Sequence, residues 1–571
     1  MTDLHPDEHY LEGAAVWTSC HTIVDEDGDH DDNDISGQQK RYNNGRLYQH
    51  PLGHNNDRAL SSIILRPALL QHDATSSSSL SVPVNTTIGG RYGAPNTVCD
   101  SPLGFIDATF AWIDKNLMDS IDFVVWTGDN ARHDSDNTHP RTQEEINTLN
   151  KIVANKVLNI FPPGPDGRRI PIIPSIGNND VYPHNILEPG PNPILQYFAA
   201  IWEEFIPESM TKTFVRGGYY AIEAVPDKIA VFSLNTLYFY ANNAAVDGCK
   251  EEEQPGTEQM DWLETELDML RERKMVAYLT GHVPPDKKSY SPTCYSRYTK
   301  ISLAYQDVIV GHLYGHANID HFFLLSHGDN KGGEEEGSPE GGLLEGEEEE
   351  RVDEYDSFHA LGLSTYLEDL WRQYDTVPKR AQLKDFGIVM VSPSVVPTFN
   401  PTLRVFSYQL GNNNNNSSGN TDDKGDRQDD TDNDGDDDDM EEQQELEEHF
   451  AEHLNTGRSA SQWSDFTSSS SHHHRKPRKH RYRRPSPASP TTFGFLQEYT
   501  QYWCNLTDAN NHATTLPTYE IEYRTREDYG LENLGVSEWL ALARRIAREE
   551  DLKRAYLDRM VVQSGANTTE A

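Results

Sequence analysis

Five short motifs in this chain combine carboxylate, imidazole and amide side chains, the types that bind divalent metal ions. The motifs are Asp3-x-His5, Gly128-Asp129-Asn130, Gly177-Asn178-Asn179-Asp180, Gly281-His282, and Gly311-His312 followed by Gly315-His316-Ala317-Asn318. Carboxylates and imidazoles bind ions of the Zn, Mn and Fe kind, and one carboxylate can bridge two of them. Each motif alone is a weak signal, because a lone Gly-His is more often structural and an Asn pair is more often a turn. All five in this order predict a two-metal site.

Apolar runs of strand length come directly before four of these motifs. The runs are 121–127, 170–176, 275–280 and 307–310, and two more lie at 228–234 and 386–392. A glycine after a strand allows the tight turn that leads out of it. Because ligands collect beyond the carboxyl ends of strands in open α/β sheets, we expect these loops to converge.

Helical patterns lie between several of the runs. Apolar residues recur at helical spacing at Leu103, Ile106, Phe110, Ile113 and Leu117, and again at Met260, Leu263, Leu267 and Leu270. Ser101-Pro102 is placed as the N-cap and first-turn residue of the first helix. Alternating strands and helices predict an α/β layered domain.

Composition separates the folded part from solvated inserts. Of 571 residues only 36% are hydrophobic, and the net charge is −43. The polar stretches 24–34, 75–81, 328–356 and 411–487 lack apolar periodicity, so we expect them to be disordered. The catalytic domain is therefore expected over 1–410, with inserts at about 24–81 and 328–356. A disordered insert at 411–490 would follow, and 491–571 would complete the domain.

The same composition excludes several classes of protein. The acidity argues against nucleic acid as a partner. No run of about 18 apolar residues exists to span a membrane. Five cysteines are too few for a disulfide scaffold and are not spaced as a zinc ribbon. The His tract and the basic run inside 411–487 are most simply a solvated linker. The alternatives are metal binding by the His tract and contact of the basic run with an anionic substrate.

Longer stretches around the motifs resemble the calcineurin-like metallophosphoesterases, and more narrowly the endopolyphosphatases of the acid sphingomyelinase-like branch. These stretches include T-D-L-H-P-D-E-H-Y-L-E-G at the start, W-T-G-D-N-A-R-H-D (126–134), S-I-G-N-N-D-V-Y-P-H-N (175–185), L-T-G-H-V-P-P (279–285) and G-H-A-N-I-D-H-F (315–322). The resemblance covers about 1–23, 82–327, 357–410 and 491–550. It implies a four-layer sandwich of two mixed β-sheets flanked by helices, and metal-dependent cleavage of internal phosphoanhydride bonds of inorganic polyphosphate.

Carried over position by position, the resemblance also implies two divalent ions, with Zn, Mn, Co, Fe and Mg all open as identities. The ligands would be Asp3, His5 and Asn318 for one ion, Asn178, His282 and His316 for the other, and Asp129 as the bridge between them. Most of the superfamily has histidine where this chain has Asn318, and a histidine that assists the leaving group where it has Asn179.

The asparagine at position 179 bears on the choice of substrate. An alkoxide leaving group is a strong base and needs a proton in the transition state. A phosphate leaving group is a weaker base, with a second pKa of about 6, so an anhydride substrate depends less on the missing acid. His133 is the remaining candidate acid or phosphate anchor, and its alternative role is a loop histidine bonded to backbone. Lys287 and Lys288 could neutralise a substrate oxyanion, or could simply lie on the surface.

The resemblance further implies a vacuolar location reached by the secretory route. An apolar strand is expected before Asp3, together with a single membrane-spanning signal anchor of type II. N-glycosylation sequons lie at Asn85, Asn505 and Asn567, and also at Asn415 and Asn416. In an oxidising lumen, Cys20 with Cys99 and Cys249 with Cys294 are the expected disulfides, which leaves Cys504 over.

Two further functions compete with polyphosphate hydrolysis. One is a phosphodiesterase of the acid sphingomyelinase-like type, although no saposin-like six-cysteine module is visible. The other is an inactive homologue that binds polyanions without cleaving them. Two ions per chain would favour an enzyme, and no ions would favour the inactive form. The sequence leaves the oligomeric state open.

Overall fold

The computed structural model describes residues 1–23, 88–165, 167–326, 360–396, 398–410, 485–512 and 516–565. Of the stretches expected to be disordered, 24–81, 328–356 and most of 411–490 lie outside these ranges. Their disorder, and the domain boundaries drawn from it, stay predictions.

Every apolar run predicted as a strand overlaps one. The strand at 307–310 continues to Tyr314, so Gly311 and His312 lie inside it and do not follow it as predicted. The strands are β3 (Val124–Trp126), β4 (Ile172–Pro174), β6 (Ile229–Ser233), β7 (Val276–Thr280), β8 (Ile309–Tyr314) and β10 (Phe386–Val391). The two predicted helices are also present, as α1 (Leu103–Asn116) and α5 (Pro255–Glu272). The spacing of apolar residues was therefore a reliable guide to these elements.

The N-cap predicted for α1 is wrong by one residue. Ser101 and Pro102 form the short strand β2, which pairs in parallel with β1 (Pro6–Asp7), and Pro102 is the N-cap. Ser101 donates its backbone N–H to the carbonyl of His5 at 2.9 Å instead of capping the helix. This long-range pairing ties the start of α1 to the first motif of the chain.

Two larger sheets form the centre of the molecule. The six-stranded sheet has the order β5-β6-β7-β8-β10-β9, with β5 (Tyr220–Val225) and β9 (His321–Ser326) antiparallel to their neighbours and the inner strands parallel. The second sheet is antiparallel and consists of β11 (Thr402–Tyr408), β12 (Leu496–Trp503) and β13 (Glu520–Arg524). The strands β3 and β4 pair separately in parallel.

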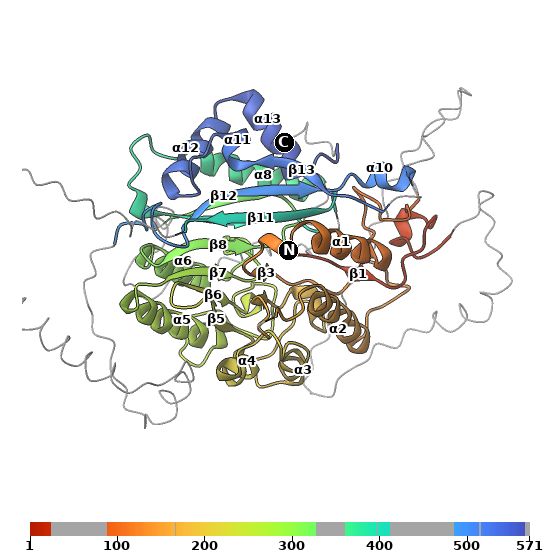
Figure 1. Ribbon diagram of the computed structural model, residues 1–571, viewed down its shortest axis with the longest axis horizontal. Helices are drawn as coiled ribbons and strands as arrows, with labels where there is room; N and C mark the ends of the chain where they lie inside the picture. The colour runs from red at the N-terminus through yellow and green to blue at the C-terminus, as the bar shows by residue number, and fades with distance from the viewer. Residues whose placement is uncertain are drawn as a thin grey trace, which may run out of the picture.

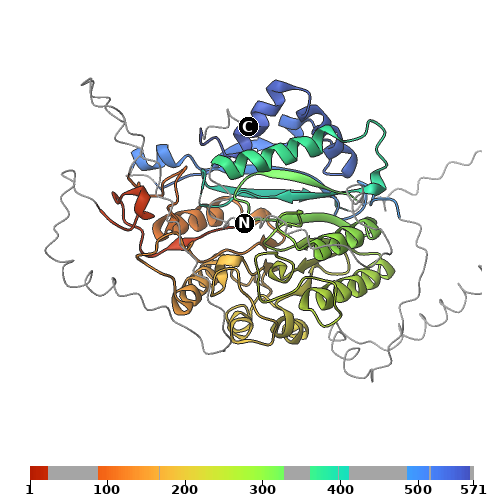
Figure 2. The same cartoon turned by 180° about the vertical axis from the view of Figure 1, so that it is seen from behind.

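Helices cover the outer faces of the sheets (Figure 1). On one side lie α2 (Gln143–Ile160), α3 (Pro193–Ile201), α4 (Thr211–Gly217), α5 and α6 (Pro292–Ala304). On the other side lie α8 (Ala360–Asp375), α11 (Thr525–Tyr529), α12 (Val536–Ile546) and α13 (Glu550–Met560). Seen from behind, α8 runs along the same side as α12 and α13 (Figure 2). The predicted four-layer α/β sandwich is confirmed.

Buried aromatic side chains fill the core, and two disulfides fasten its edges. Trp126, Trp202 and Trp539 are almost completely buried. The predicted disulfides Cys20–Cys99 and Cys249–Cys294 are both present, and Cys504 is free and buried. Within the described ranges, no helix is long and apolar enough to cross a membrane.

Candidate metal centre

The predicted ligands come together where several strands end. Asp129 follows β3, Asn178 begins the single-turn helix η5 (Asn178–Asp180) after β4, and His282 follows β7. His316 and Asn318 lie between β8 and β9. All seven predicted ligands are buried: Asp3, His5, Asp129, Asn178, His282, His316 and Asn318.

Five of the seven predicted ligands have a left-handed backbone conformation. Their φ angles are 48° for Asp3, 36° for His5, 56° for Asp129, 73° for His316 and 55° for Asn318. Asn, Asp and His enter this region more readily than other residues, but it still costs free energy outside glycine. Such strain collects at functional sites, where the surrounding structure over-determines the backbone.

Two glycines allow the loops to approach one another. A Cβ atom on Gly177 would lie 2.0 Å from Oδ1 of Asp129, and one on Gly315 would lie 2.6 Å from Oδ2 of Asp3. Any larger residue would push these carboxylates away. The glycines before the ligands therefore do more than turn the chain, because they also make room for the ligands of neighbouring loops.

Backbone hydrogen bonds hold the first residues against β3 and the loop that follows it. Asp3 donates its N–H to the carbonyl of Gly128 at 3.0 Å, and Leu4 and His5 donate theirs to the carbonyl of Asp129 at 3.0 and 3.2 Å. On the other side, Val395 donates to the carbonyls of Thr2 and Asp3 at 3.2 and 3.1 Å. These contacts place Asp3 and His5 beside Asp129. The strand expected before Asp3 stays a prediction.

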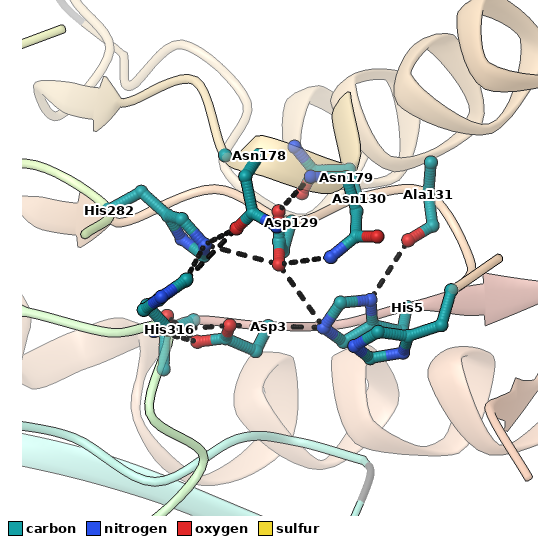
Figure 3. Close-up of polar contacts among 12 residues, drawn as sticks. Asp3, His5, Asp129, Asn130, Ala131, Asn178, Asn179, His282 and His316 are labelled. Atoms are coloured by element: carbon teal, nitrogen blue, oxygen red, sulfur yellow. Dashed lines mark hydrogen bonds and ion pairs between the residues drawn. The ribbon is translucent and has the colours of Figure 1, made fainter. Parts of the chain in front are cut away.

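The Asp129 carboxylate lies between the two predicted groups of ligands. Its Oδ2 atom is 3.5 Å from Nε2 of His5 and 3.1 Å from Nε2 of His282 (Figure 3). Nε2 of His5 is in turn 3.8 Å from Oδ1 of Asp3. One carboxylate therefore faces a ligand of each proposed ion, as a bridging ligand must.

The second ligand group surrounds the Asn178 side chain. Its Oδ1 atom lies 2.7 Å from Nε2 of His282 and 3.0 Å from Nδ1 of His316. The two imidazoles are 3.1 Å apart at these nitrogens. One oxygen and two ring nitrogens thus face a common point (Figure 3), which suits a single divalent ion.

The histidines are oriented by backbone carbonyls on their far sides. Nδ1 of His5 lies 2.9 Å from the carbonyl oxygen of Ala131, and Nδ1 of His282 lies 2.8 Å from that of Thr127. Since a carbonyl only accepts, both rings carry their proton on Nδ1 when neutral and present the Nε2 lone pair to the centre. Metal-ligating histidines are commonly fixed in this way.

Two observations show that the residues fit a pair of ions. Among the described residues, Nε2 of His5 and Oδ1 of Asn318 are buried atoms without a hydrogen-bond partner. Leaving such atoms unpaired is costly, and an ion would satisfy both. Three imidazoles, of His5, His282 and His316, and the side-chain oxygens of Asp3, Asp129, Asn178 and Asn318 form a mixed N/O set that suits Zn, Mn, Co or Fe.

The electrostatics of the centre indicate a deficit of positive charge. Burial alone lowers the pKa of an imidazole, yet the nearby carboxylates of Asp3 and Asp129 raise the pKa of His5 to about 9. Asp129 similarly raises the pKa of His282, to about 10, against the effect of burial. The negative charge of the carboxylates therefore favours the protonated form of both imidazoles. Divalent ions would displace these protons on binding.

His133 lies at the edge of the centre and is paired with a carboxylate that the sequence analysis did not single out. Its Nδ1 atom is 2.7 Å from Oδ1 of Asp100, and its backbone N–H donates to Oδ2 of Asp100 at 2.6 Å. Its ring stacks on that of His5 at 4.0 Å between centroids. Despite its own burial, Asp100 has a lowered pKa because His133 lies beside it. The pair forms an Asp–His dyad whose ring is partly exposed.

The Asn179 side chain contacts Asp129 and does not take the position of a metal ligand. Its backbone N–H and its Nδ2 atom donate to the two oxygens of Asp129, each at 2.9 Å. The buried guanidinium of Arg141 donates through Nη1 to the backbone oxygen of Asn179 at 3.0 Å and to Oδ1 at 3.3 Å. Arg141 therefore fixes the orientation of the amide that supports Asp129. The sequence analysis did not identify this arginine.

Asp180 joins the loops that carry Asp129 and Asn178. Its carboxylate accepts backbone N–H groups from Asp129 at 2.9 Å, Asn130 at 2.6 Å and Gly177 at 2.8 Å. Burial and the charge of Asp129 raise the pKa of Asp180 to about 6. The only sequence signal for it was its place at the end of the Gly177-Asn178-Asn179-Asp180 motif.

The two lysines predicted to bind substrate have their contacts elsewhere. Nζ of Lys288 pairs with Oδ2 of Asp369 at 2.8 Å, with more than half of the lysine side chain exposed. Nζ of Lys287 lies 6.0 Å from the centre of the Tyr295 ring. Neither contact involves a predicted ligand, and a role for these lysines at substrate stays a prediction.

Comparison with known proteins agrees with this geometry. A family model described as calcineurin-like phosphoesterase matches residues 102–319. An endopolyphosphatase from Cryptococcus neoformans is 37% identical over 424 residues, which cover 72% of this chain and 58% of that protein. One from Candida glabrata is 31% identical over 639 residues, covering 99% and 86%. One from Saccharomyces cerevisiae is 29% identical over 464 residues, covering 72% and 60%. For several relatives the chain spans only about half of their length, with 47% for one from Neurospora crassa and 55% for one from Yarrowia lipolytica.

Ligands of the N/O type at strand ends, with an Asp–His dyad beside them, agree with the metallophosphoesterase class that the family match indicates. The chain belongs to the calcineurin-like phosphoesterases, in the family that it shares with these fungal endopolyphosphatases.

Proposed function

We propose that this protein hydrolyses internal phosphoanhydride bonds of inorganic polyphosphate and releases shorter chains. The observation that carries the proposal is the Asp129 carboxylate between His5 and His282, with Asn178 and His316 beside His282 and the His133–Asp100 dyad at the edge of the centre. Two relatives that this chain covers over most of their length both carry the name endopolyphosphatase. Their name supports the choice of substrate within the phosphoesterases.

The residues divide between two ions as follows. Asp3, His5 and Asn318 would hold one, Asn178, His282 and His316 would hold the other, and Asp129 would bridge them. When bound, such a pair supplies an activated water and neutralises phosphoryl charge. The identity of the ions, among Zn, Mn, Co, Fe and Mg, is left to measurement.

The protein's own groups would then manage the leaving phosphate. The Asp100 carboxylate holds Nδ1 of His133, so Nε2 is the nitrogen that can give or take a proton at the substrate. Asn179 can donate a hydrogen bond from its amide but cannot transfer a proton at neutral pH. A leaving phosphate with a second pKa of about 6 needs less protonation than an alkoxide. The set of groups therefore suits an anhydride better than an alkyl phosphodiester.

We also infer an oxidising compartment on the secretory route, and the vacuolar lumen in particular. Two disulfides in a chain with five cysteines support the oxidising environment. The sequon residue Asn505 is exposed at the start of α10 (Leu506–Asn511), where a glycan has room. The sequons at Asn85 and Asn567 lie outside the described residues. Membrane attachment stays a prediction.

Incubation of metal-loaded protein with long-chain polyphosphate, followed by sizing of the products on a gel, tests the proposal. Cleavage within the chain gives intermediate lengths early in the reaction, whereas cleavage from the ends gives orthophosphate at once. Asp129→Asn serves as the inactive control. Turnover of sphingomyelin or of bis(p-nitrophenyl) phosphate with no cleavage of polyphosphate would instead select the phosphodiesterase. A protein that binds neither ion and cleaves nothing would be the inactive homologue.

A further inference from the structure

A second group of imidazoles and carboxylates lies next to the metal centre and shares no ligand with it. We call it the His21 cluster, and it consists of His21, Asp136 and His139. The cluster is close in sequence to the metal centre at two places. Asp7, which contacts His21, follows His5 by two residues, and Asp136 follows His133 by three. Nothing in the proposed hydrolysis uses these side chains.

One carboxylate oxygen in the cluster is flanked by two ring nitrogens. Oδ2 of Asp136 lies 2.7 Å from Nδ1 of His21 and 2.9 Å from Nδ1 of His139. The metal centre has the same arrangement around Asn178, with 2.7 and 3.0 Å from its oxygen to the two imidazoles. The cluster thus repeats, with a charged oxygen, the pattern of the second ion's ligands.

Outer contacts orient the cluster as they orient metal ligands. Nε2 of His21 lies 2.8 Å from Oδ2 of Asp7, which holds the ring from behind and turns Nδ1 toward Asp136. The other oxygen of Asp136 accepts hydrogen bonds from the backbone N–H of Thr138 at 2.8 Å and from its hydroxyl at 2.6 Å. A carboxylate–histidine pair behind a ligand nitrogen is typical of metal sites.

A simple hydrogen-bonded clamp is the competing interpretation. Burial lowers the pKa of His21, but Asp7 and Asp136 raise it overall, so a protonated His21 could bond to both carboxylates. That clamp requires one imidazole only. His139, whose side chain is 40% exposed, could join the clamp by donating from Nδ1 to the same oxygen at 2.9 Å, and the Thr138 hydroxyl lies 3.0 Å from that nitrogen. The ring of His9 also lies within 5.7 Å of His21 and 5.3 Å of His139.

We propose that the His21 cluster binds a third divalent cation, of the Zn, Mn or Co kind, through Nδ1 of His21, Oδ2 of Asp136 and Nδ1 of His139. Bonds of about 2.0–2.2 Å in tetrahedral geometry separate ligand atoms by roughly 3.4 Å. The two ring nitrogens would therefore each move away from Oδ2 by less than about 1 Å. Because His139 is partly exposed, the remaining position faces solvent and can hold water.

Such an ion would connect two segments that carry catalytic groups. His21 and Asp7 belong to the segment after His5, while Asp136 and His139 belong to the loop after His133. Because the imidazoles must be neutral to bind a cation, protons compete with the ion for the cluster. The site does not depend on which phosphate compound the enzyme cleaves.

Counting ions in the full chain tests the proposal without reference to activity. Wild type, His139→Ala and a control, His512→Ala, are equilibrated with Co²⁺ or Mn²⁺, dialysed, and analysed for metal per chain by plasma mass spectrometry. His512 is an exposed histidine at the end of α10, and it belongs to none of the candidate ligand groups found among the described residues. We expect three ions in wild type and in His512→Ala, and two in His139→Ala. His139→Gln should also hold two, because an amide is a poorer ligand than an imidazole.

The metal centre provides an independent check. In Asp129→Asn, where the bridging ligand is lost, the ion of the His21 cluster should stay while the occupancy of the other two falls. If His139→Ala is unstable, Asp136→Asn gives the same expected loss of one ion. Two ions in wild type, or three in His139→Ala, would overturn the proposal. The hydrogen-bonded clamp around His21 would then be the correct interpretation of the cluster. Failure to cleave polyphosphate would alter neither count, so the proposed function and the third site fail separately.

Discussion

The two cysteines of the Cys20–Cys99 disulfide stand directly before one residue of the His21 cluster and one residue of the His133–Asp100 dyad. His21 follows Cys20, and Asp100, which holds Nδ1 of His133, follows Cys99. We predict that replacing both cysteines by serine lowers stability and also misplaces the His133–Asp100 dyad. The second disulfide, Cys249–Cys294, adjoins no predicted ligand in sequence and provides a matched control.

The two disulfides should contribute similar amounts to stability. The first closes a loop with a sequence separation of 79 residues, for which the chain-entropy model gives about 4.5 kcal/mol. The second closes a separation of 45 residues, for which the same model gives about 4 kcal/mol. These values are upper estimates, because unfolded chains keep some structure. Both double variants should therefore unfold at lower temperature, and by comparable amounts.

Their effects on catalysis should differ. A positioned general acid contributes roughly 10²–10⁴ in rate. Because a phosphate leaving group depends on the acid less than an alkoxide does, loss of the dyad geometry should lower kcat by about 100-fold, or about 2.7 kcal/mol. Cys20→Ser/Cys99→Ser should show this loss at a temperature well below its unfolding transition, with both ions of the centre still bound. Cys249→Ser/Cys294→Ser should keep kcat within about threefold of wild type under the same conditions.

Differential scanning fluorimetry gives the unfolding temperature of each double variant. Turnover of long-chain polyphosphate is then measured at a temperature about 20 degrees below the lower of these two values. Asp100→Asn in the disulfide-bonded protein should reproduce the kinetic defect without the loss of stability. Equal loss of kcat in both double variants would refute the reasoning, since the first disulfide would then act only through stability. Full activity in Cys20→Ser/Cys99→Ser would refute it as well.

Three other changes give sharp outcomes. Asp129→Asn removes the bridging charge and should abolish hydrolysis while the far-UV circular dichroism stays unchanged; near-normal turnover with both ions bound would contradict the two-ion assignment. Burial, together with the charge of Asp320, raises the pKa of Glu522 to about 8, above the usual value of a carboxyl. Ionising Glu522 therefore costs stability as the pH rises from about 4.5 toward 8, and Glu522→Gln should raise the unfolding temperature at pH 9 but not at pH 5; equal shifts at both values would exclude this cause. Deletion of 411–484 should leave turnover of polyphosphate within about tenfold, or about 1.4 kcal/mol, and a larger drop would show that the basic run contacts substrate.

The ligands of the centre could be predicted from the sequence because each sits in a short local pattern. A strand-length apolar run, a glycine and a polar ligand follow one another within ten residues in four of the five motifs. The parallel order of β6, β7 and β8 then brings their ends to one edge without further information. Apolar runs and apolar periodicity located six strands and the helices α1 and α5 for the same reason.

The supporting residues could not be predicted, because their partners lie far away in the sequence. Asp100 is separated from His133 by 33 positions, Arg141 from Asn179 by 38, and Asp180 from Asn130 by 50. The misplaced N-cap at Ser101 has the same origin, since its partner is His5. The strands β11 and β13 were also missed, because many of their side chains are only half buried and show no clean alternation. Tertiary contacts, and not local propensity, decided all of these.

The costs built into the centre argue against an inactive, ion-free homologue. Five ligands have positive φ angles, each costing about 1 kcal/mol even for residue types that tolerate the region. The ligand atoms Nε2 of His5 and Oδ1 of Asn318 are buried without a hydrogen bond among the described residues, which costs about 1–3 kcal/mol apiece. The carboxylates near the two imidazoles, Asp129 above all, also raise the pKa of His5 to about 9 and that of His282 to about 10, against the effect of burial. A polyanion-binding surface needs none of this and would be weakened by the buried negative charge. Ions present at 100 times their dissociation constant would each stabilise the folded protein by about 2.7 kcal/mol. They would also bind the unpaired atoms and make the charge of the centre positive. The geometry therefore favours a centre that holds cations, as the proposed hydrolysis requires.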